Sequence, residues 1–263
     1  MSDRALYVYG VVPTTSPAQL FADVRGVDPS EPVVLVHDGD LAAVASRVRL
    51  DEFGEAAIGD NLRDPSWLAE KARAHDHVLA AAVGRTTILP FRFGAIYNGE
   101  EQIRELLRER SDFSETLARL EGAIELGVKA VVDLPILRDR LATTATADDD
   151  VASTGRAYMQ RKQLERRLDE DAARFTTDCA DASHERLSSL AREARTNALQ
   201  QLDDADARRR MILNGAYLVA TDAQAPFREA LTALEQTYAA DGVRYDLTGP
   251  WPPYNFVGDD ERS

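Results

Sequence analysis

The chain has 263 residues, of which 44% are apolar, and its formal net charge at pH 7 is −14. This length and composition fit a folded protein with a substantial hydrophobic core, and they exclude a disordered chain. Nucleic acids and anionic lipid surfaces both select positively charged proteins, so the net charge argues against either of them as a partner.

Cysteine content and apolar runs indicate the compartment. Cys179 is the only cysteine, so it cannot form an intrachain disulfide, and we expect a reducing environment. The N-terminal residues 1–4 lack the pattern of a secretory signal. No apolar run approaches the roughly 18 residues that a membrane-spanning helix needs. The sequence therefore predicts a cytoplasmic protein without a lipid membrane as a partner.

Short-range signals in the first half of the chain predict strands interleaved with helices. Residues 5–12 form a continuous apolar run that Pro13 ends, which is typical of a buried strand. Asp38 and Gly39 separate two apolar runs and favour a tight hairpin turn. Asp64 can cap a helix that begins at the following proline. The same kinds of signal predict strands at 32–36, 41–45, 86–97 and 124–133, and helices at 65–83, from 98 onward and at 111–122.

The middle of the chain predicts a linker followed by long helical structure. Residues 135–151 include a polar, aspartate-rich stretch that we expect to be a linker. Residues 153–202 contain no proline, and their apolar side chains keep helical spacing over most of the segment. This pattern predicts either one helix of unusual length or an antiparallel helix pair. A gap near Ser183 favours the pair.

The remaining residues predict a second, smaller α+β unit. We expect a strand at 210–220, a helix at 226–238 and an alternating strand at 243–247. The predicted fold class is therefore α+β with two domains. An N-terminal mixed α/β sheet domain would occupy 1–134, and a C-terminal α+β domain would occupy 152–263.

Candidate catalytic and metal-binding residues do not form a recognisable set. His75 and His77 lie two apart on a predicted helix, so their side chains point about 200° apart and cannot share one ion. Cys179 keeps apolar helical spacing and is expected to be a buried small residue. The aspartates at 148–150 lack the spacing of a calcium loop. No glycine-rich phosphate cradle or serine nucleophile elbow is present, so we predict a protein that is not an enzyme and holds no cofactor or metal.

The first of two aromatic strings occupies residues 89–97. If it is extended, strand alternation directs Phe91 and Phe93 to one face and Arg92 to the other. Arg92 could then form an intramolecular ion pair, which is the favoured interpretation, or bind a carboxylate of an acidic partner. Tyr97 ends the string.

The second string occupies residues 249–257 and has three prolines within four positions. Prolines remove backbone donors, so this segment cannot be a central strand and should lie along an edge or across a groove. Trp251, Tyr254 and Phe256 would anchor it, each contributing about 4–6 kcal/mol at most if buried. Docking onto its own domain is the favoured interpretation, and a partner surface is the alternative.

Tyr158 and Lys162 lie four residues apart and would share one face of a helix. Ordinary surface and core patterning is the favoured interpretation of this pair, and contact with a partner is the alternative.

Four strings in this order, residues 7–12, 89–97, 155–162 and 249–256, resemble the gas vesicle protein GvpL/GvpF family, and the last string is the most specific. The resemblance implies an accessory protein of gas vesicle assembly, either a minor vesicle component or a chaperone-like adaptor. It also favours a ferredoxin-like variant for the C-terminal domain. The implied partners are the hydrophobic shell subunit and other gas vesicle accessory proteins, and the implied location is cytoplasmic and gas vesicle associated.

The resemblance marks several residues as partner-binding candidates without assigning a chemical role to each side chain. They are Phe91, Arg92, Phe93, Tyr97, Tyr158, Lys162, Trp251, Tyr254 and Phe256. A different class of function stays open as the alternative, namely a small-molecule-binding regulatory module or an unrecognised enzyme on a ferredoxin-like fold. A filled core with an exposed apolar strip would favour the adaptor, whereas a deep pocket with converging polar groups would favour the alternative.

Overall fold

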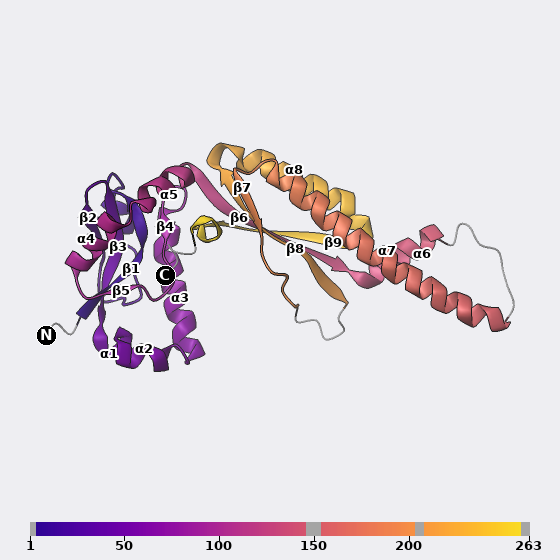
Figure 1. Cartoon of the computed structure of the whole chain (residues 1–263), viewed down its shortest axis with the longest axis horizontal. Helices are drawn as coiled ribbons and strands as arrows, with labels where there is room; N and C mark the ends of the chain where they lie inside the picture. Colours follow the sequence, from indigo (N-terminus) through magenta and orange to yellow (C-terminus); the bar gives the residue numbers. More distant parts are fainter. Residues whose placement is uncertain (1–3, 146–153, 203–207, 259–263) are drawn as a thin grey trace. The chain divides into compact units, whose positions relative to one another are not determined.

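The computed structural model describes residues 4–145, 154–202 and 208–258, which form a mixed α/β protein with two β-sheets (Figure 1). The chain divides into two compact units. Unit 1 comprises Met1–Glu125 together with Pro250–Ser263, and unit 2 comprises Leu126–Gly249. The division into domains at 1–134 and 152–263 stays a prediction.

Unit 1 is built on a five-stranded sheet with the order β2-β3-β1-β4, in which β5 also pairs with β1. The predicted buried strand and the predicted hairpin are both confirmed, and all the strand pairs are antiparallel. Gly10 faces β4 so closely that a β-carbon there would lie 2.4 Å from the Leu89 carbonyl oxygen. The strands are β1 (Arg4–Pro13), β2 (Val33–Asp38), β3 (Leu41–Arg49), β4 (Leu89–Pro90) and β5 (Ile96–Tyr97).

The longest helix of unit 1, α3 (Pro65–Ala82), begins where the sequence places a capping residue. The Asp64 carboxylate accepts hydrogen bonds from the backbone N–H groups of Ser66 (2.9 Å) and Trp67 (3.4 Å), which confirms the predicted cap. Val78 and Leu79 of the helix that follows are buried in the core with β1. The helices are α1 (Leu50–Phe53), α2 (Glu55–Asn61), α3 (Pro65–Ala82), α4 (Glu100–Glu109) and α5 (Asp112–Leu120).

Unit 2 contains a four-stranded sheet with the order β7-β8-β6-β9. Alternate residues of β6 are buried as predicted, including Ala130 and Val132, and they share a core with Ala172 and Cys179. The strands are β6 (Ala123–Asp133), β7 (Glu193–Thr196), β8 (Arg209–Ala220) and β9 (Val243–Trp251). The helices are α6 (Leu134–Ala145), α7 (Thr154–Ser188) and α8 (Gln224–Tyr238).

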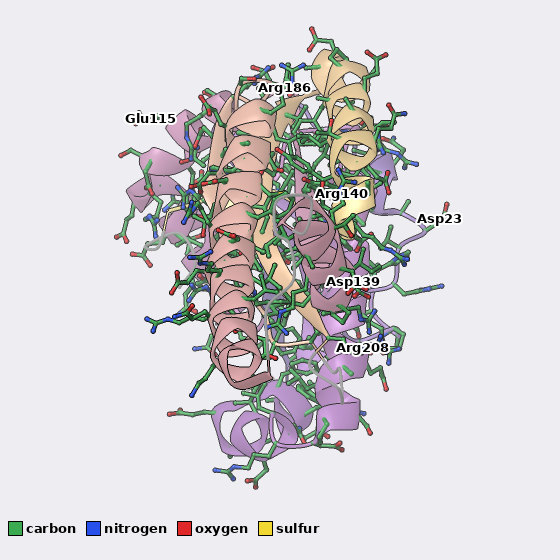
Figure 2. All side chains as sticks on the ribbon, turned by 90° about the vertical axis from the view of Figure 1, so that its right-hand side faces the viewer. Asp23, Glu115, Asp139, Arg140, Arg186 and Arg208 are labelled. Atoms are coloured by element: carbon green, nitrogen blue, oxygen red, sulfur yellow. The ribbon has the colours of Figure 1, made fainter. Side chains whose placement is uncertain are left out.

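The predicted helix pair is wrong, because α7 is a single helix of 35 residues. Ser183 does not interrupt it, since the Ser183 hydroxyl donates to the Cys179 carbonyl oxygen one turn earlier (2.6 Å). Arg186 lies in the last turn of α7, where a cation favours the negative end of the helix dipole (Figure 2). The residues beyond Ser188 form β7 where continued helix was expected.

The segment predicted as a linker is partly helical. Its residues up to Ala145 belong to α6, where Leu137 is buried and Arg138 pairs with Asp169 of α7 at 2.5 Å. Leu137 belongs to the core that α6 shares with α7. The remainder of the predicted linker, 146–151, lies outside the described residues.

Candidate functional site

The two aromatic strings meet inside unit 1 around His75 of α3. The Phe93 ring from the first string lies 6.0 Å from the His75 ring and 5.9 Å from the ring of Tyr7 on β1, measured between centroids. Tyr254 from the second string reaches the opposite nitrogen of the same imidazole. His75 and Tyr254, which are 179 positions apart in the chain, are therefore in direct contact.

A continuous chain of hydrogen bonds runs through this cluster. The Gly94 N–H donates to the Tyr7 hydroxyl (3.0 Å), and the Tyr254 hydroxyl donates to Asp76 Oδ1 (3.1 Å). Because the single hydroxyl proton of Tyr254 is used in the bond to Asp76, the Tyr254 oxygen can only accept from His75, so His75 Nε2–H donates to it (3.1 Å). Tyr7 O–H then donates to His75 Nδ1 (2.9 Å). Both ring nitrogens are therefore hydrogen-bonded when the imidazole is neutral.

Burial controls the protonation of this cluster. Removal from water lowers the pKa of His75 to about 4, because the charged imidazolium is the form that loses hydration. Burial likewise raises the pKa of Tyr7 and of Tyr254 far above the usual value, and the nearby Asp76 adds to the effect on Tyr254. At pH 7 the imidazole and both phenols are therefore uncharged.

Replacing His75 with glutamine should flatten the pH dependence of stability in unit 1. The usual pKa of 6.5 applies to the unfolded chain, so between pH 6.5 and 4 the unfolded state binds a proton that the folded state excludes. The stability linked to His75 is complete above pH 6.5 and falls by about 2 kcal/mol at pH 5. Urea titrations at pH 7 and pH 5 measure this loss, and an equal loss in the wild type and the variant would contradict it.

The C-terminal string is fixed to unit 1 by backbone and side-chain contacts. Glu125, which is buried, accepts hydrogen bonds from the Asn255 backbone N–H (2.9 Å) and side-chain Nδ2 (2.6 Å). Arg119 of α5 donates to the Phe256 carbonyl oxygen at 2.5 Å, and the Phe256 ring is completely buried. The expectation that the string docks onto its own C-terminal domain is therefore wrong, because its contacts are with the N-terminal unit.

The residues of the first string do not alternate as an extended strand would. Phe91 contacts the Phe113 ring of α5 at 5.7 Å between centroids, whereas Phe93 packs against Trp67 of α3. The chain turns at Phe93 and Gly94, where Gly94 has φ 98°, and the two phenylalanines enter different clusters. The prediction that they share one face is wrong.

The partner-binding candidates divide by exposure. Phe91 and Phe256 are buried, while Phe93, Tyr97 and Tyr254 are half-buried. Arg92, Lys162 and Trp251 are exposed, the last to 47%. Within the described parts of the chain Arg92 makes no ion pair, so the favoured intramolecular pair is not observed. Tyr158 lies in α7, but its side chain is outside the described residues.

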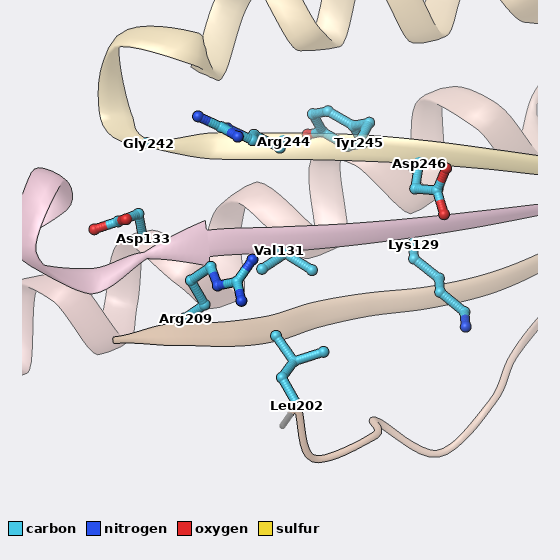
Figure 3. Close-up of a pocket in the computed structure, with 9 residues that line it drawn as sticks. All are labelled: Lys129, Val131, Asp133, Leu202, Arg209, Gly242, Arg244, Tyr245 and Asp246. Atoms are coloured by element: carbon cyan, nitrogen blue, oxygen red, sulfur yellow. The ribbon is translucent and has the colours of Figure 1, made fainter. Parts of the chain in front are cut away.

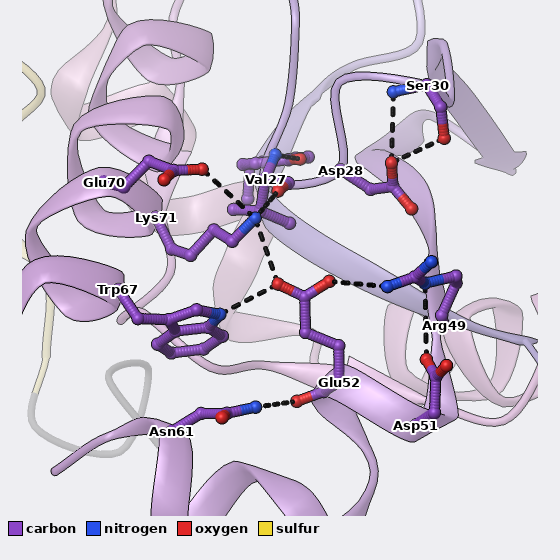
Figure 4. Close-up of polar contacts among 11 residues, drawn as sticks. Val27, Asp28, Ser30, Arg49, Asp51, Glu52, Asn61, Trp67, Glu70 and Lys71 are labelled. Atoms are coloured by element: carbon purple, nitrogen blue, oxygen red, sulfur yellow. Dashed lines mark hydrogen bonds and ion pairs between the residues drawn. The ribbon is translucent and has the colours of Figure 1, made fainter. Parts of the chain in front are cut away.

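A second polar cluster in unit 1 surrounds Lys71, whose side chain is only 8% exposed (Figure 4). Its ammonium group donates to the Val27 carbonyl oxygen (3.0 Å) and pairs with Glu52 (3.1 Å) and Glu70 (3.4 Å). Trp67 Nε1 donates to the same Glu52 carboxylate at 2.8 Å. These contacts tie α1 and α3 to the loop before β2, so the cluster is structural.

Unit 2 has a hollow of about 480 Å3 lined by both cationic and anionic side chains (Figure 3). Lys129 donates to Gln200 at 3.1 Å, and Asp133 accepts from the Ile136 backbone N–H at 3.3 Å. The Tyr245 hydroxyl bonds to Ser183 of α7 at 2.6 Å, away from Lys129. Three polar groups of the hollow are thus each hydrogen-bonded to a different segment of unit 2, which is unlike a catalytic set.

Two other kinds of feature, a metal-binding cluster and a membrane-spanning helix, are not found among the described residues. No three histidine, cysteine or acidic side chains gather closely enough there to hold a metal ion. None of the helices that the structure describes combines the length and apolar character needed to cross a bilayer. The sequence did not assign Tyr7, Asp76, Arg119 or Glu125 to the site. Tyr7 opens the first string of the family resemblance, whereas no motif or spacing marks the other three.

Comparison with known proteins identifies the family. The family described as gas vesicle synthesis protein GvpL/GvpF matches residues 5–258. Gas vesicle protein L of Streptomyces sp. (strain CB03234) is 33% identical, covering 98% of this chain and 94% of the relative. Gas vesicle protein F1 of Halobacterium salinarum is 27% identical, covering 96% and 92%.

Solved structures show the same fold. GvpF from Anabaena sp. PCC7120 superposes with a TM-score of 0.68 at 20% identity, covering 97% of this chain and 96% of that one. GvpF from Microcystis aeruginosa gives 0.63 at 22% identity, covering 96% and 98%. Together with the match over nearly the whole sequence, these findings place the chain in the gas vesicle GvpL/GvpF family, whose members take part in gas vesicle assembly.

Proposed function

We propose that this protein is an accessory factor of gas vesicle assembly that works by contact, as a minor vesicle component or a chaperone-like adaptor for the hydrophobic shell subunit. One observation carries the proposal. The two aromatic strings form a single cluster in which both ring nitrogens of His75 are hydrogen-bonded to tyrosines, while Arg92 and Trp251 of the same strings face outward.

The outward residues suit a protein partner. An exposed tryptophan offers apolar area at small entropic cost, and tryptophan and arginine are enriched among the residues that dominate interface energies. The Arg92 guanidinium can hold a carboxylate through two parallel hydrogen bonds. The net charge of −14 would keep the adaptor in solution while it holds an apolar subunit. Cytoplasmic, gas vesicle associated localisation and contacts with other gas vesicle accessory proteins belong to the same proposal.

The proposed architecture has two domains, the second a ferredoxin-like variant. Unit 2 follows the order β6, α7, β7, β8, α8, β9, with α6 inserted after β6. Its strands are arranged as β7-β8-β6-β9. This alternation of two strand–helix–strand halves supports a ferredoxin-like variant carrying one long helix.

Replacing Trp251 with alanine should weaken capture of the shell subunit about 30-fold, which corresponds to the loss of about 2 kcal/mol typical of such an anchor. Arg92→Glu should weaken it at least as much if the partner presents a carboxylate. Leu62→Ala and Arg63→Glu change comparably exposed residues of unit 1 and serve as matched controls. Co-purification with the shell subunit and titration of the purified pair measure the effect. Absence of binding by the wild type at micromolar concentration would reject the adaptor.

The alternative function, a small-molecule-binding regulatory module or an unrecognised enzyme, has the hollow of unit 2 as its best support. Its volume is within the range of ligand pockets. However, Lys129 and Asp133 are already engaged by the protein itself, as described above, so the adaptor is favoured.

A further inference from the structure

The exposed edges of the two sheets differ in how they are protected against pairing with another strand. Natural edge strands are kept single by shortness, charge or proline. β4 and β5 have two residues each, and β4 contains Pro90. β7 has four residues, two of them charged, and β9 carries Arg244, Asp246 and Pro250. Each of these described edges therefore has at least one such safeguard.

The outer edge of β2 has none of these safeguards over residues 33–36, which read Val-Val-Leu-Val. Its register with β3 is regular, with no bulge to twist the edge away. Val34 is 41% exposed. Alternate residues of an edge strand direct their N–H and C=O groups outward. In backbone pairing the described residues supply one neighbour along this edge, the single bridge between Arg25 and Pro32 at the start of the strand, while Arg108 of α4 pairs with Asp38 at its end at 2.7 Å.

The two ends of this edge carry opposite charges. Arg25 lies beside the first residue of the edge, and Asp40 follows the last residue in the hairpin turn. Both side chains are exposed, and neither forms an ion pair with any residue that the structure describes. When two identical edges pair about a two-fold axis the strands run antiparallel, so the start of one meets the end of the other. Arg25 of one copy would then approach Asp40 of its partner copy at both ends.

From this self-complementarity we infer that β2 is the pairing surface for a second copy of this chain. The two five-stranded sheets join into one continuous sheet, with backbone hydrogen bonds across the two-fold axis and Val34 covered. One short strand contributes a small interface, and each copy carries a charge of −14, so the dimer is weak. The inference is independent of the shell subunit.

Sedimentation equilibrium over protein concentrations from about 1 μM to 1 mM should show the mass rising from 29.0 kDa towards twice that value. Val34→Lys introduces the charge that other edges carry and should raise the dissociation constant about tenfold or more. Val34→Thr keeps the branched side chain without a charge and should associate almost as the wild type does. A mass that stays at 29.0 kDa throughout would overturn the inference, even if the protein binds the shell subunit.

A charge exchange tests the orientation. Arg25→Glu and Asp40→Lys should each reduce self-association, because like charges meet at both ends of either homodimer. Mixing the two variants should restore association, since each contact then joins opposite charges. Circular dichroism verifies that both variants are folded. If Val34→Lys and both charge variants associate as the wild type does, or if mixing restores nothing, β2 is not the interface.

Discussion

Replacing Phe256 with alanine should destabilise unit 1 by about 3–5 kcal/mol, which is the usual cost of removing a buried phenylalanine. The ring is completely buried although it lies close to the C-terminal end of the chain. Its removal opens a cavity beside the segment that Arg119 and Glu125 hold in place. Loss of that packing should also loosen Tyr254, whose hydroxyl completes the hydrogen-bond chain at His75.

Fluorescence can follow this effect in unit 1 alone. Trp67 and Trp251 are the only tryptophans, and both belong to unit 1. Urea unfolding monitored at these residues should shift to lower denaturant in Phe256→Ala, while the long helix of unit 2 dominates a separate circular dichroism signal. Phe256→Leu retains most of the volume and should cost about 1 kcal/mol. A wild-type midpoint for Phe256→Ala would show that the C-terminal string is not docked.

Replacing Lys71 with methionine should cost about 2–3 kcal/mol, because it leaves the Val27 carbonyl oxygen without its donor and leaves the Glu52 carboxylate with Arg49, at 3.5 Å, as its remaining cation. The effect is smaller than for a fully buried ion pair. The Glu52 side chain is 21% exposed, and Trp67 still donates to it. Tryptophan fluorescence in urea measures the change.

A double variant separates the charge from the packing around Lys71. Adding Glu52→Gln to Lys71→Met removes the carboxylate that has lost its buried ammonium partner and should recover part of the lost stability. Arg63→Ala breaks the fully solvent-facing pair with Asp60 and should leave the unfolding midpoint unchanged. If Lys71→Met behaves like Arg63→Ala, the Lys71 cluster does not hold α3 to the sheet.

Elements with strong local signals were predictable from the sequence. The Asp38–Gly39 turn, the Asp64 cap and the alternation along β6 depend on neighbouring residues, and the structure confirms all three. β7 escaped prediction because its sequence, Glu-Ala-Arg-Thr, has no apolar alternation. It is a strand because β8 supplies a hydrogen-bonding edge, a tertiary effect that the local sequence does not encode.

The candidate site was predictable only in its parts. The two aromatic strings attracted attention by composition, and the proline-rich string ends an edge strand as expected. Their meeting at His75 could not be predicted, because a contact between residues 75 and 254 depends on the whole path of the chain. Residue spacing argued against His75 as part of a metal site, but it gave no sign that the two ring nitrogens of His75 would bond to two tyrosines.

The return of residues 250–256 to unit 1 has a consequence for biosynthesis. A ribosome completes 1–125 and the whole of unit 2 before it reaches the tyrosine and phenylalanine that finish the first unit. During translation the contacts of Tyr254 with His75 and of Phe256 with Arg119 therefore form only after the final stretch leaves the exit tunnel. A prematurely terminated product would lack these contacts, so its first unit would be more open to proteases and chaperones.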